Sequence, residues 1–369
     1  MKTRPEETVL ILTTHTGGGH LNLAQALKDL LEIHYHVAIV DPQPGIIDRC
    51  YASVSRHWMN LLAWQYSCTD NEIVSFLLHG SLTPLSIGRI LSIIGHIQPR
   101  LIITTHALLS YATARAIERS RKHIPLVFQL TDLERVHMTW FSEKHADAYL
   151  APTREIFAQA LENGIDPNRL HATGRPIRRQ FIDTSACNST IYRGETLTSL
   201  GLDPALFTIF LQGGAKGSAG IDRTIASLLS TKMQIILAAG NNKDLVARYA
   251  GMEQVRVLPF TETIALYMAA ADMIAGKAGA SFISEAFMLE KPLLVTAFIP
   301  GQETPNLQFI ERHNLGWVCL ETTAQQELLT DIANNPTMLD EKINSIRTYK
   351  AWNGEANRSI YPVIERLLS

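Results

Sequence analysis

The amino-acid sequence predicts an α/β protein of two doubly wound domains, each a parallel sheet covered by helices. The chain has 369 residues, which is more than a typical single domain contains. Short apolar runs typical of strands alternate with segments of helical spacing, and such alternation produces parallel sheets. Several of these runs end in glycine-rich loops, which lie where ligands bind in sheets of this kind.

The first half of the chain contains one set of alternating elements. The expected elements are strand 9–14, helix 21–33, strand 37–40, helix 84–95, strand 101–104, helix 108–119, strand 126–130 and strand 148–151. Residues 46–82 interrupt the pattern with Trp, Tyr and Arg side chains and few acidic ones. This segment is either ordinary core beneath a long loop or a surface that contacts lipid, because aromatic and basic side chains suit a membrane interface.

A polar stretch, 176–200, separates this set from a second one and is expected to be a linker. The elements expected after it are strand 207–211, helix 221–229, strand 234–238, helix 243–249, strand 255–258, helix 264–270, strand 272–275, a helix from 280, strand 293–297 and helices 305–311, 325–333, 338–349 and 355–368. We therefore expect domains at 1–175 and 201–350 that face a cleft. Residues 351–369 are expected to form a helix that returns towards the first domain.

Composition narrows the class of protein. A formal net charge of -2 and a pI near 6.7 argue against a nucleic-acid-binding protein, which usually carries a basic surface. The four cysteines lie far apart, so we expect neither a metal site nor disulfides, and a reducing, cytoplasmic compartment. The polar start of the chain excludes a secretory signal, and no uncharged apolar run reaches the length of a membrane-spanning helix. Any membrane contact is therefore expected to be peripheral.

The glycine loop at 17–19 leads into His20 at the start of a helix. The loop has neither the spacing of a dinucleotide fingerprint nor the Lys-Ser/Thr pair of a Walker loop. A histidine at the carboxyl edge of a strand, with no neighbouring side chains to shield it, is placed to accept a proton. The alternative is a helix-start histidine that only hydrogen-bonds its neighbours. The motif alone leaves both interpretations open.

Polar and aromatic side chains also follow the strand expected at 126–130. Asp132 is a candidate to orient or electrostatically support a catalytic imidazole. His137 and Trp140 are candidates to contact a phosphate or an acceptor. Each of the three could instead be a structural residue whose polar groups are satisfied within the protein.

The segment 274–306 combines glycine, acid and amide residues in an order that core packing does not require. A strand runs into a glycine turn at 276–279, and a helix then opens near Ala280 and carries Glu285. A helix N-terminus beside such a turn binds anions, because its amides point outward and its dipole favours negative charge. A carboxylate beside amide donors also suits a ribose diol.

Further glycine and amide residues end other strands of the same half. Gln302, Glu303 and Asn306 follow the next strand, while 213–214 and 240–241 end two earlier ones. Any one such loop could be only a tight turn between a strand and a helix. Several of them at the carboxyl edge of one sheet indicate a ligand site.

These motifs together resemble the monogalactosyldiacylglycerol synthase branch of glycosyltransferase family 28, which includes bacterial processive diacylglycerol glucosyltransferases. The segments that carry the resemblance are 16–20, 131–133, 137–141, 174–178, 212–214, 276–279, 284–286, 300–303 and Asn306. The resemblance implies the GT-B fold, with two Rossmann-like domains facing a cleft. It assigns the acceptor and the membrane contact to the first domain, and a UDP-sugar to the second. It also implies transfer with inversion, with the UDP-sugar as co-substrate and no other cofactor or metal.

The resemblance also implies roles for single residues, with His20 as the general base. The residues implied on the acceptor and phosphate side are Gly18, Gly19, His137 and Trp140. The residues implied on the donor side are Gly213, Gly214, Gly240, Asn241, Phe260, Lys277, Gly279, Ser281, Glu285, Gln302, Glu303 and Asn306. Among them the Gly213–Gly214 pair would approach the diphosphate, Phe260 the uracil and Glu285 the ribose. The chain departs from the family pattern at Ala215, Ala280 and Phe282, which affects the phosphate loop more than the ribose site.

The expected activity is therefore transfer of a hexose, galactose ahead of glucose, from a UDP-sugar to diacylglycerol to make a glycolipid. The expected partners are the UDP-sugar, diacylglycerol and a membrane surface, including anionic lipids, with no nucleic acid. Two alternatives stay open. The acceptor could be a polyprenyl-linked sugar, or the chain could be a regulatory protein that binds a nucleotide-sugar without turnover.

Overall fold

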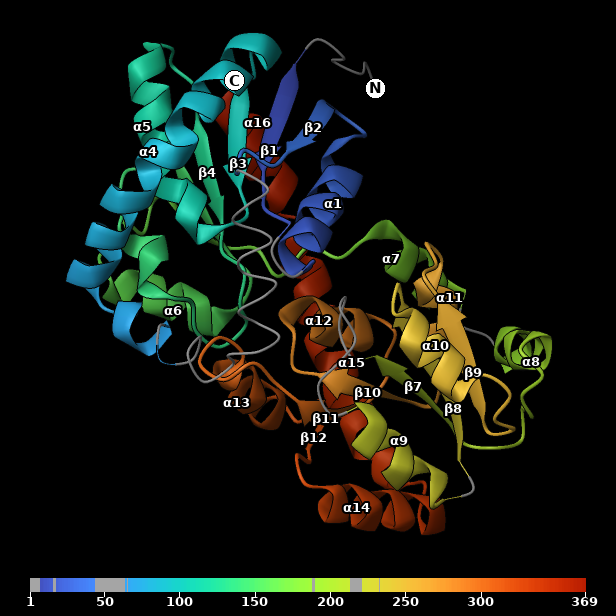
Figure 1. The fold of residues 1–369 in the computed structure, drawn as a ribbon. Helices are drawn as coiled ribbons and strands as arrows, with labels where there is room; N and C mark the ends of the chain where they lie inside the picture. The colour runs from blue at the N-terminus through green and yellow to red at the C-terminus, as the bar shows by residue number, and fades with distance from the viewer. Residues whose placement is uncertain are drawn as a thin grey trace. The chain divides into compact units, whose positions relative to one another are not determined.

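The computed structural model describes residues 7–15, 18–43, 64, 66–187, 190–212, 221–231 and 233–369 (Figure 1). Contacts between Cα atoms divide the chain into two compact units. Unit 1 consists of Met1–Arg178, Pro300–Pro305 and Trp352–Ser369. Unit 2 consists of Arg179–Ile299 and Asn306–Ala351.

Unit 1 is built on a six-stranded parallel sheet with the order β2-β1-β3-β4-β5-β6. Its strands are β1 (Thr8–Leu12), β2 (His36–Val40), β3 (Leu101–Thr104), β4 (Leu126–Gln129), β5 (Ala148–Ala151) and β6 (Leu170–Ala172). Its helices are α1 (Gly19–Leu31), α4 (Glu72–Ile97), α5 (Ala107–Ser120), the 3-10 helix η1 (Met138–Phe141), α6 (Arg154–Glu162) and α16 (Ile360–Leu368). Alternate side chains of β1 enter two different buried clusters, as the period of a strand requires.

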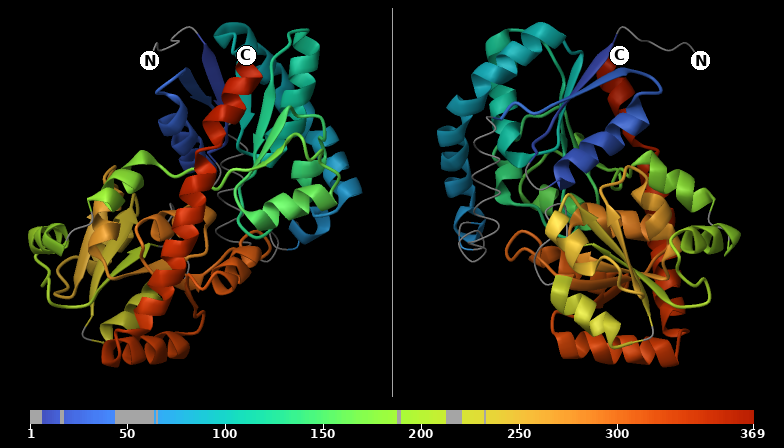
Figure 2. Two further views of the ribbon diagram at one scale, coloured as in Figure 1. Left: turned by 180° about the vertical axis from the view of Figure 1, so that it is seen from behind. Right: turned by 45° about the vertical axis from the view of Figure 1, so that its right-hand side comes forward.

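The C-terminal helix α16 completes one of those clusters. Its apolar side chains Ile360, Val363 and Ile364 pack with Val9 and Ile11 of β1. The back view in Figure 2 shows α16, in red, against the strands of unit 1. Residues 352–369 therefore contribute core to unit 1, although they are the last residues of the chain.

Helix α4 is much longer than the helix expected at 84–95. It begins at Glu72, where the side chain of Asn71 accepts a hydrogen bond from the Ile73 amide at 3.0 Å, a helix cap that the aromatic composition of the region obscured. By length and composition alone, α4 could cross a membrane. Of its most apolar stretch, 28% is buried within the protein. The expectation concerned uncharged apolar runs, and the uncharged run that begins at Ile73 ends at Gly88, before Arg89. What the sequence pattern missed is the part of the helix before residue 84.

Unit 2 is built on a second six-stranded parallel sheet, with the order β12-β11-β10-β7-β8-β9. Its strands are β7 (Thr208–Gln212), β8 (Gln234–Gly240), β9 (Val255–Pro259), β10 (Met273–Lys277), β11 (Leu293–Ala297) and β12 (Gly316–Val318). The helices that begin in it are α7 (Arg179–Ala186), α8 (Thr190–Ser199), α9 (Ile221–Leu229), α10 (Lys243–Tyr249), α11 (Ile264–Ala270), α12 (Ala280–Met288), α14 (Thr322–Asn334) and α15 (Met338–Asn357). A further helix, α13 (Thr304–Arg312), begins at the end of unit 1 and continues in unit 2. The stretch expected as a linker, 176–200, contains α7 and α8.

Gly276 lies within β10 and not in a turn. The strand pairs Gly276 with Gln212 of β7. A Cβ atom added at Gly276 would lie 2.3 Å from the backbone oxygen of Gln212, which is closer than two such atoms can approach. Glycine is therefore required here by the packing of adjacent strands.

Candidate active site

His20 stands on the first turn of α1, immediately after β1. Gly18 precedes the helix with a φ of 81°, a backbone conformation that glycine adopts at little cost. Gly19 is the first residue of α1. This turn presents the His20 ring at the carboxyl edge of the sheet, where part of its surface is exposed.

The two nitrogens of the His20 ring have different surroundings. Nδ1 lies 2.7 Å from the backbone oxygen of Thr105. A carbonyl oxygen can only accept, so Nδ1 carries the hydrogen in the neutral ring and Nε2 holds a lone pair. The pKa of His20 is lowered to about 4. Burial is the main cause, the charge of Arg175 also lowers the pKa, and the hydrogen bond to Thr105 opposes the change. His20 is therefore a neutral imidazole at pH 7 and able to accept a proton at Nε2.

Asp132 does not supply the hydrogen bond that orients this imidazole, because the Nδ1 partner is the Thr105 carbonyl. The Asp132 carboxylate instead accepts a long hydrogen bond, 3.4 Å, from the Thr131 hydroxyl. Burial raises the pKa of Asp132 to about 7, while Arg175 lowers this pKa and Glu303 raises it. Of the two roles expected for Asp132, electrostatic support of the His20 imidazole remains. Asp132 would exert it as a group that changes charge near neutral pH.

Arg175 is a residue of this site to which the sequence reasoning gave no role. Its side chain is 3% exposed, and its guanidinium donates to the Thr131 backbone oxygen. The side chain of Asn353 binds both backbone groups of Arg175. Its Oδ1 accepts a hydrogen bond from the Arg175 amide at 2.7 Å, and its Nδ2 donates one to the Arg175 backbone oxygen at 3.1 Å. In the sequence, Arg175 lies between Gly174 and Pro176, and this pattern was the only signal that pointed to it. Its burial could not be predicted from the pattern, because arginines are rarely buried unless they have partners.

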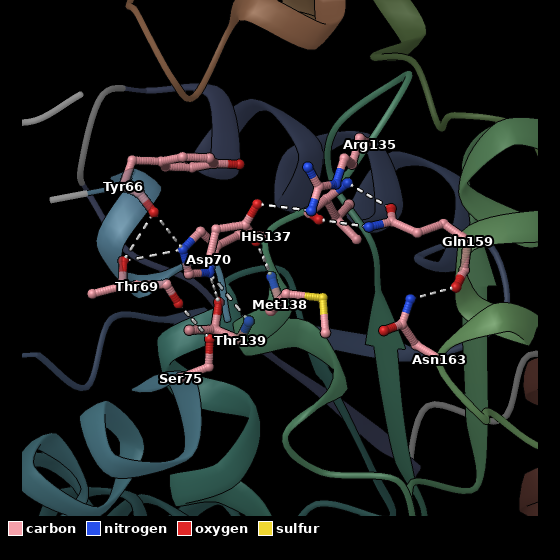
Figure 3. A network of polar contacts seen from close by, with 11 residues as sticks. Tyr66, Thr69, Asp70, Ser75, Arg135, His137, Met138, Thr139, Gln159 and Asn163 are labelled. Carbon is pink, nitrogen blue, oxygen red and sulfur yellow. Dashed lines mark hydrogen bonds and ion pairs between the residues drawn. The ribbon is translucent and has the colours of Figure 1, made fainter. Parts of the chain in front are cut away.

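The side chain of His137 forms hydrogen bonds with two segments of unit 1, residues 66–69 and the start of η1 (Figure 3). Its Nε2 lies 3.1 Å from the Thr69 hydroxyl oxygen and 3.3 Å from the backbone oxygen of Tyr66. Its Nδ1 accepts from the Thr139 amide at 3.1 Å, at the start of η1. Both ring nitrogens are thus occupied by the protein, and the ring ties residues 66–69 to η1. A contact between His137 and a phosphate would have to replace one of these bonds.

Two neighbours strengthen the same junction. Asp70 accepts from the Met138 amide at 2.9 Å and pairs with Arg135 at 2.9 Å. Trp140, expected on the acceptor side, is 2% exposed and packs against Phe128 in the core. Its indole therefore has almost no surface to offer a ligand in this structure.

Several residues expected on the donor side lie along the carboxyl edge of the unit 2 sheet. Gly240 ends β8 with a φ of 54°, and its backbone oxygen accepts from the Phe260 amide at 3.1 Å. Asn241 is exposed, and the Phe260 side chain is 66% exposed. The structure therefore brings Phe260 to the end of β8, although the two are distant in the sequence.

The junction between β10 and α12 holds the next group of expected donor residues. Lys277 is the last residue of β10, and Gly279 precedes α12 without a capping side chain. Ser281 follows in the first turn of α12, where it is partly exposed, and Glu285 lies one turn later and is buried. Asn306 is buried and donates to the backbone oxygen of Ala278 at 2.9 Å, so it secures this loop to α13.

The other expected donor residues are not part of this group. Gln302 and Glu303 belong to unit 1, where Glu303 is buried and acts on the pKa of Asp132. Gly213 and Gly214 lie outside the described residues. The expected donor set is thus divided between the two units, which the order of residues along the chain did not indicate.

Comparison of the fold with solved structures shows its class. The structure of Anabaena HepE in complex with UDP and glucose matches 98% of this chain and 100% of its own, with a TM-score of 0.59 and 16% identity. Acinetobacter baumannii MurG matches with a TM-score of 0.57 and 14% identity, covering 95% of this chain and 99% of its own. Together with the two parallel six-stranded sheets, these matches define the fold as GT-B.

Comparison of the sequence shows the family. A family model for monogalactosyldiacylglycerol (MGDG) synthase matches residues 20–177, and one for the glycosyltransferase family 28 C-terminal domain matches residues 208–351. The chain belongs to the monogalactosyldiacylglycerol synthase branch of glycosyltransferase family 28. Membership makes it a glycosyltransferase and indicates a role in glycolipid synthesis.

The curated relatives agree with this placement. A probable monogalactosyldiacylglycerol synthase 2, chloroplastic, of Oryza sativa subsp. indica is 28% identical over 341 residues, covering 85% of this chain and 71% of the relative. Monogalactosyldiacylglycerol synthase 3, chloroplastic, of Arabidopsis thaliana is 27% identical over 335 residues, covering 84% and 70%. The similarity thus extends over most of both chains.

Proposed function

We propose that the protein transfers a hexose from a UDP-sugar to the hydroxyl of diacylglycerol, with galactose ahead of glucose and with inversion at the anomeric carbon. The observation that carries the proposal is the His20 ring, neutral and with Nε2 available, in a chain of this family. A hydroxyl is a weak nucleophile at neutral pH, so removal of its proton by a positioned imidazole speeds the attack. The reaction as proposed uses no bound cofactor or metal.

The proposal assigns the donor mainly to unit 2. The N-terminus of α12 would stabilise the negative charge that develops on the leaving UDP, because the helix dipole and the first-turn amides favour an anion. Glu285 would bind the ribose and Phe260 the uracil. The other residues that we propose for the donor are Gly213, Gly214, Gly240, Asn241, Lys277, Gly279, Ser281 and Asn306, with Gln302 and Glu303 of unit 1 for the sugar hydroxyls.

The test is a glycolipid assay with pure protein and liposomes that contain diacylglycerol. Labelled UDP-galactose, UDP-glucose, UDP-N-acetylglucosamine and UDP-glucuronate are supplied in separate reactions, and lipid products are separated and counted. We expect a glycolipid from UDP-galactose at the highest rate. No glycolipid from any of the four donors would contradict the proposal. UDP binding without turnover, unchanged in His20→Ala, would favour the regulatory alternative, and product on a polyprenyl-linked acceptor alone would favour that acceptor.

Replacement of Glu285 by glutamine is expected to weaken UDP binding roughly 10- to 100-fold, because a hydrogen bond to a charged group contributes about 1.5 to 3 kcal/mol. The glutamine keeps the size of the side chain, so α12 should remain folded. Isothermal titration with UDP gives the dissociation constant. Glu327→Gln, an exposed acid on α14, is the matched control. An unchanged Kd for UDP in Glu285→Gln would remove Glu285 from the donor site.

The lipid side of the proposal is supported by the exposed apolar surface of α4. Ile73 and Leu77, four residues apart on one face of the helix, are 72% and 64% exposed, and Phe76 beside them is also exposed. Ile73 and Phe76 also line an open pocket of about 500 Å³ with Tyr111 and Phe141, and the other residues that line it are polar or charged. Exposed apolar patches of this kind indicate contact with a membrane or another molecule. We assign this one to the surface of the lipid bilayer that holds the acceptor.

Exchange of Ile73 and Leu77 for serine is expected to weaken binding to diacylglycerol-containing vesicles by tenfold or more, since burying one such side chain contributes about 1.5 to 3 kcal/mol. Vesicle sedimentation measures the affinity. The melting temperature should not fall, because both side chains are already exposed to water. Leu161→Ser on α6, 38% exposed, controls for the loss of an exposed leucine. Equal vesicle binding by the double variant and the control would contradict this assignment.

A further inference from the structure

His106 stands beside the proposed base on a different element. It precedes α5, and its ring lies against the ring of His20, with centroids 4.4 Å apart and planes at 62°. The two residues are 86 positions apart in the sequence, and the register of β1 with β3 brings them together. We propose that His106 is a positioning residue that holds the His20 ring in the orientation and tautomer in which Nε2 accepts the proton.

The first step of the argument concerns the carbonyl that His20 faces. Thr105 is fully buried, and its amide donates to the Leu12 backbone oxygen at 3.0 Å. Its hydroxyl donates to the Thr13 hydroxyl oxygen at 2.9 Å. Thr105 is thus tied through its amide to the last residue of β1 and through its hydroxyl to the residue after it. The oxygen that receives the Nδ1 hydrogen of His20 therefore has a fixed position.

The second step concerns what keeps the His106 ring in place. Its Nδ1 accepts from the Leu108 amide at 3.2 Å, which caps the N-terminus of α5. A nitrogen that accepts in this way has no hydrogen, so the neutral ring carries its hydrogen on Nε2. Protonation of Nδ1 would break the cap. Burial lowers the pKa of His106 well below its ordinary value, and the nearby His20 and His79 lower it further.

The third step concerns what this ring does to His20. A flip of the His20 ring about the Cβ–Cγ bond would exchange Nδ1 with Cδ2 and Nε2 with Cε1. It would therefore turn the hydrogen-bearing nitrogen away from Thr105. A rigid neighbour at 4.4 Å resists the rotation by steric contact. Because His106 stays neutral, it adds no positive charge beside His20 when His20 becomes an imidazolium. The charged group that acts on His20 is Arg175.

The role in catalysis rests on the proposed function, but the positioning itself has a readout that does not require activity. Long-range NMR spectra of the protein labelled with ¹⁵N-histidine report which ring nitrogen carries the hydrogen, and His20→Gln assigns the His20 signals. In the unmodified protein we expect hydrogen on Nδ1 of His20 throughout pH 5 to 8. Extending the titration below pH 4 gives the pKa of His20.

Two variants separate the ring of His106 from its cap. His106→Asn removes the ring and keeps a side-chain oxygen that can cap α5. We expect it to melt near the temperature of the unmodified protein, to show mixed tautomers at His20, and to lower kcat by up to roughly 100-fold without raising KM for the UDP-sugar, as misplacement of a reacting group does. His106→Phe keeps a ring and loses the cap, so it should melt lower and retain the Nδ1-H tautomer.

The outcomes are distinguishable from a failure of the proposed function. A His20 tautomer and pKa in His106→Asn identical to those of the unmodified protein would overturn the positioning role, whether or not transfer is detected. Loss of the tautomer in His106→Phe, with the tautomer retained in His106→Asn, would assign the effect to the cap alone and would also overturn it. Absence of glycolipid product from the unmodified protein, with the expected NMR spectra, would contradict the transferase and leave the positioning intact.

Discussion

His20→Ala is expected to lower the rate of glycolipid formation by about 10² to 10⁴-fold, the usual contribution of general base catalysis. Alanine removes the only group that we propose to take the acceptor proton and leaves the donor residues of unit 2 in place. UDP binding should therefore be unchanged while kcat falls. Steady-state kinetics with diacylglycerol liposomes, together with titration by UDP, measure the two quantities separately.

The matched control is His123→Ala, which removes an exposed histidine of the same unit. It should retain full activity. Circular dichroism must show that His20→Ala is folded, and its loss of one ring hydrogen bond should cost only about 1 kcal/mol of stability. A folded His20→Ala protein with more than a tenth of the original kcat would remove His20 from the role of base.

The pH dependence of the unmodified enzyme tests the same residue. The neutral form of His20 is the active one, and burial lowers its pKa to about 4. Protonation of His20 should therefore abolish activity only as the pH falls towards 4. An ordinary histidine would already be mostly protonated below its usual pKa of about 6.5. Asp132 also changes charge near pH 7, so the same profile is measured in Asp132→Asn. Loss of kcat around pH 6.5 in that variant, with UDP binding unchanged over the same pH range, would contradict the buried neutral base.

Gly276→Ala is expected to destabilise unit 2 by about 3 kcal/mol, at the upper end of the cost of forcing an atom into a packed site. The added Cβ would lie 2.3 Å from the Gln212 backbone oxygen and 3.0 Å from the Phe282 ring. The ring can move, but the oxygen belongs to the neighbouring strand. Strands β7 and β10 would have to separate for the methyl group to enter.

Urea unfolding followed by far-UV circular dichroism measures this loss as a lower midpoint. Gly194→Ala is the matched control, because nothing lies within 4 Å of a Cβ added at that position of α8. Alanine in a helix should raise the midpoint slightly or leave it unchanged. Equal midpoints for both variants, with UDP binding lost only in Gly276→Ala, would restore the interpretation of Gly276 as part of a glycine turn at an anion-binding helix N-terminus.

Local patterning predicted most of unit 2 and five of the six strands of the unit 1 sheet. The bounds expected for α9, α10, α11 and β11 agree with the structure at both ends, because each has clear apolar periodicity and a turn residue at its limits. Several short or polar elements of the described residues were not predicted, namely α6, β6, α7, α8, β12 and the 3-10 helix η1. They have too few apolar residues to show a period, and packing against longer neighbours stabilises them.

The sequence identified candidate functional residues, but it indicated only some of their roles. The glycine loop identified His20 as a candidate base, and the order of acid and amide residues identified the β10–α12 junction. Asp132 was expected to orient the imidazole or to support it electrostatically, and the first of these roles belongs instead to the Thr105 backbone oxygen, which lies at Nδ1. A backbone carbonyl leaves no signal in a sequence, since every residue has one.

The amino-acid sequence alone determined the fold class, because apolar periods of two and of three to four residues reflect which side chains each element must bury. It also determined the family, since His20, Glu285 and the glycine loops occur in a characteristic order. Only the tertiary structure decided which partner each group has. The pairing of β1 with β3 brings His106 to His20, and the pairing of β7 with β10 makes glycine necessary at 276. Both depend on contacts between residues that are far apart in the chain, and local spacing does not encode such contacts.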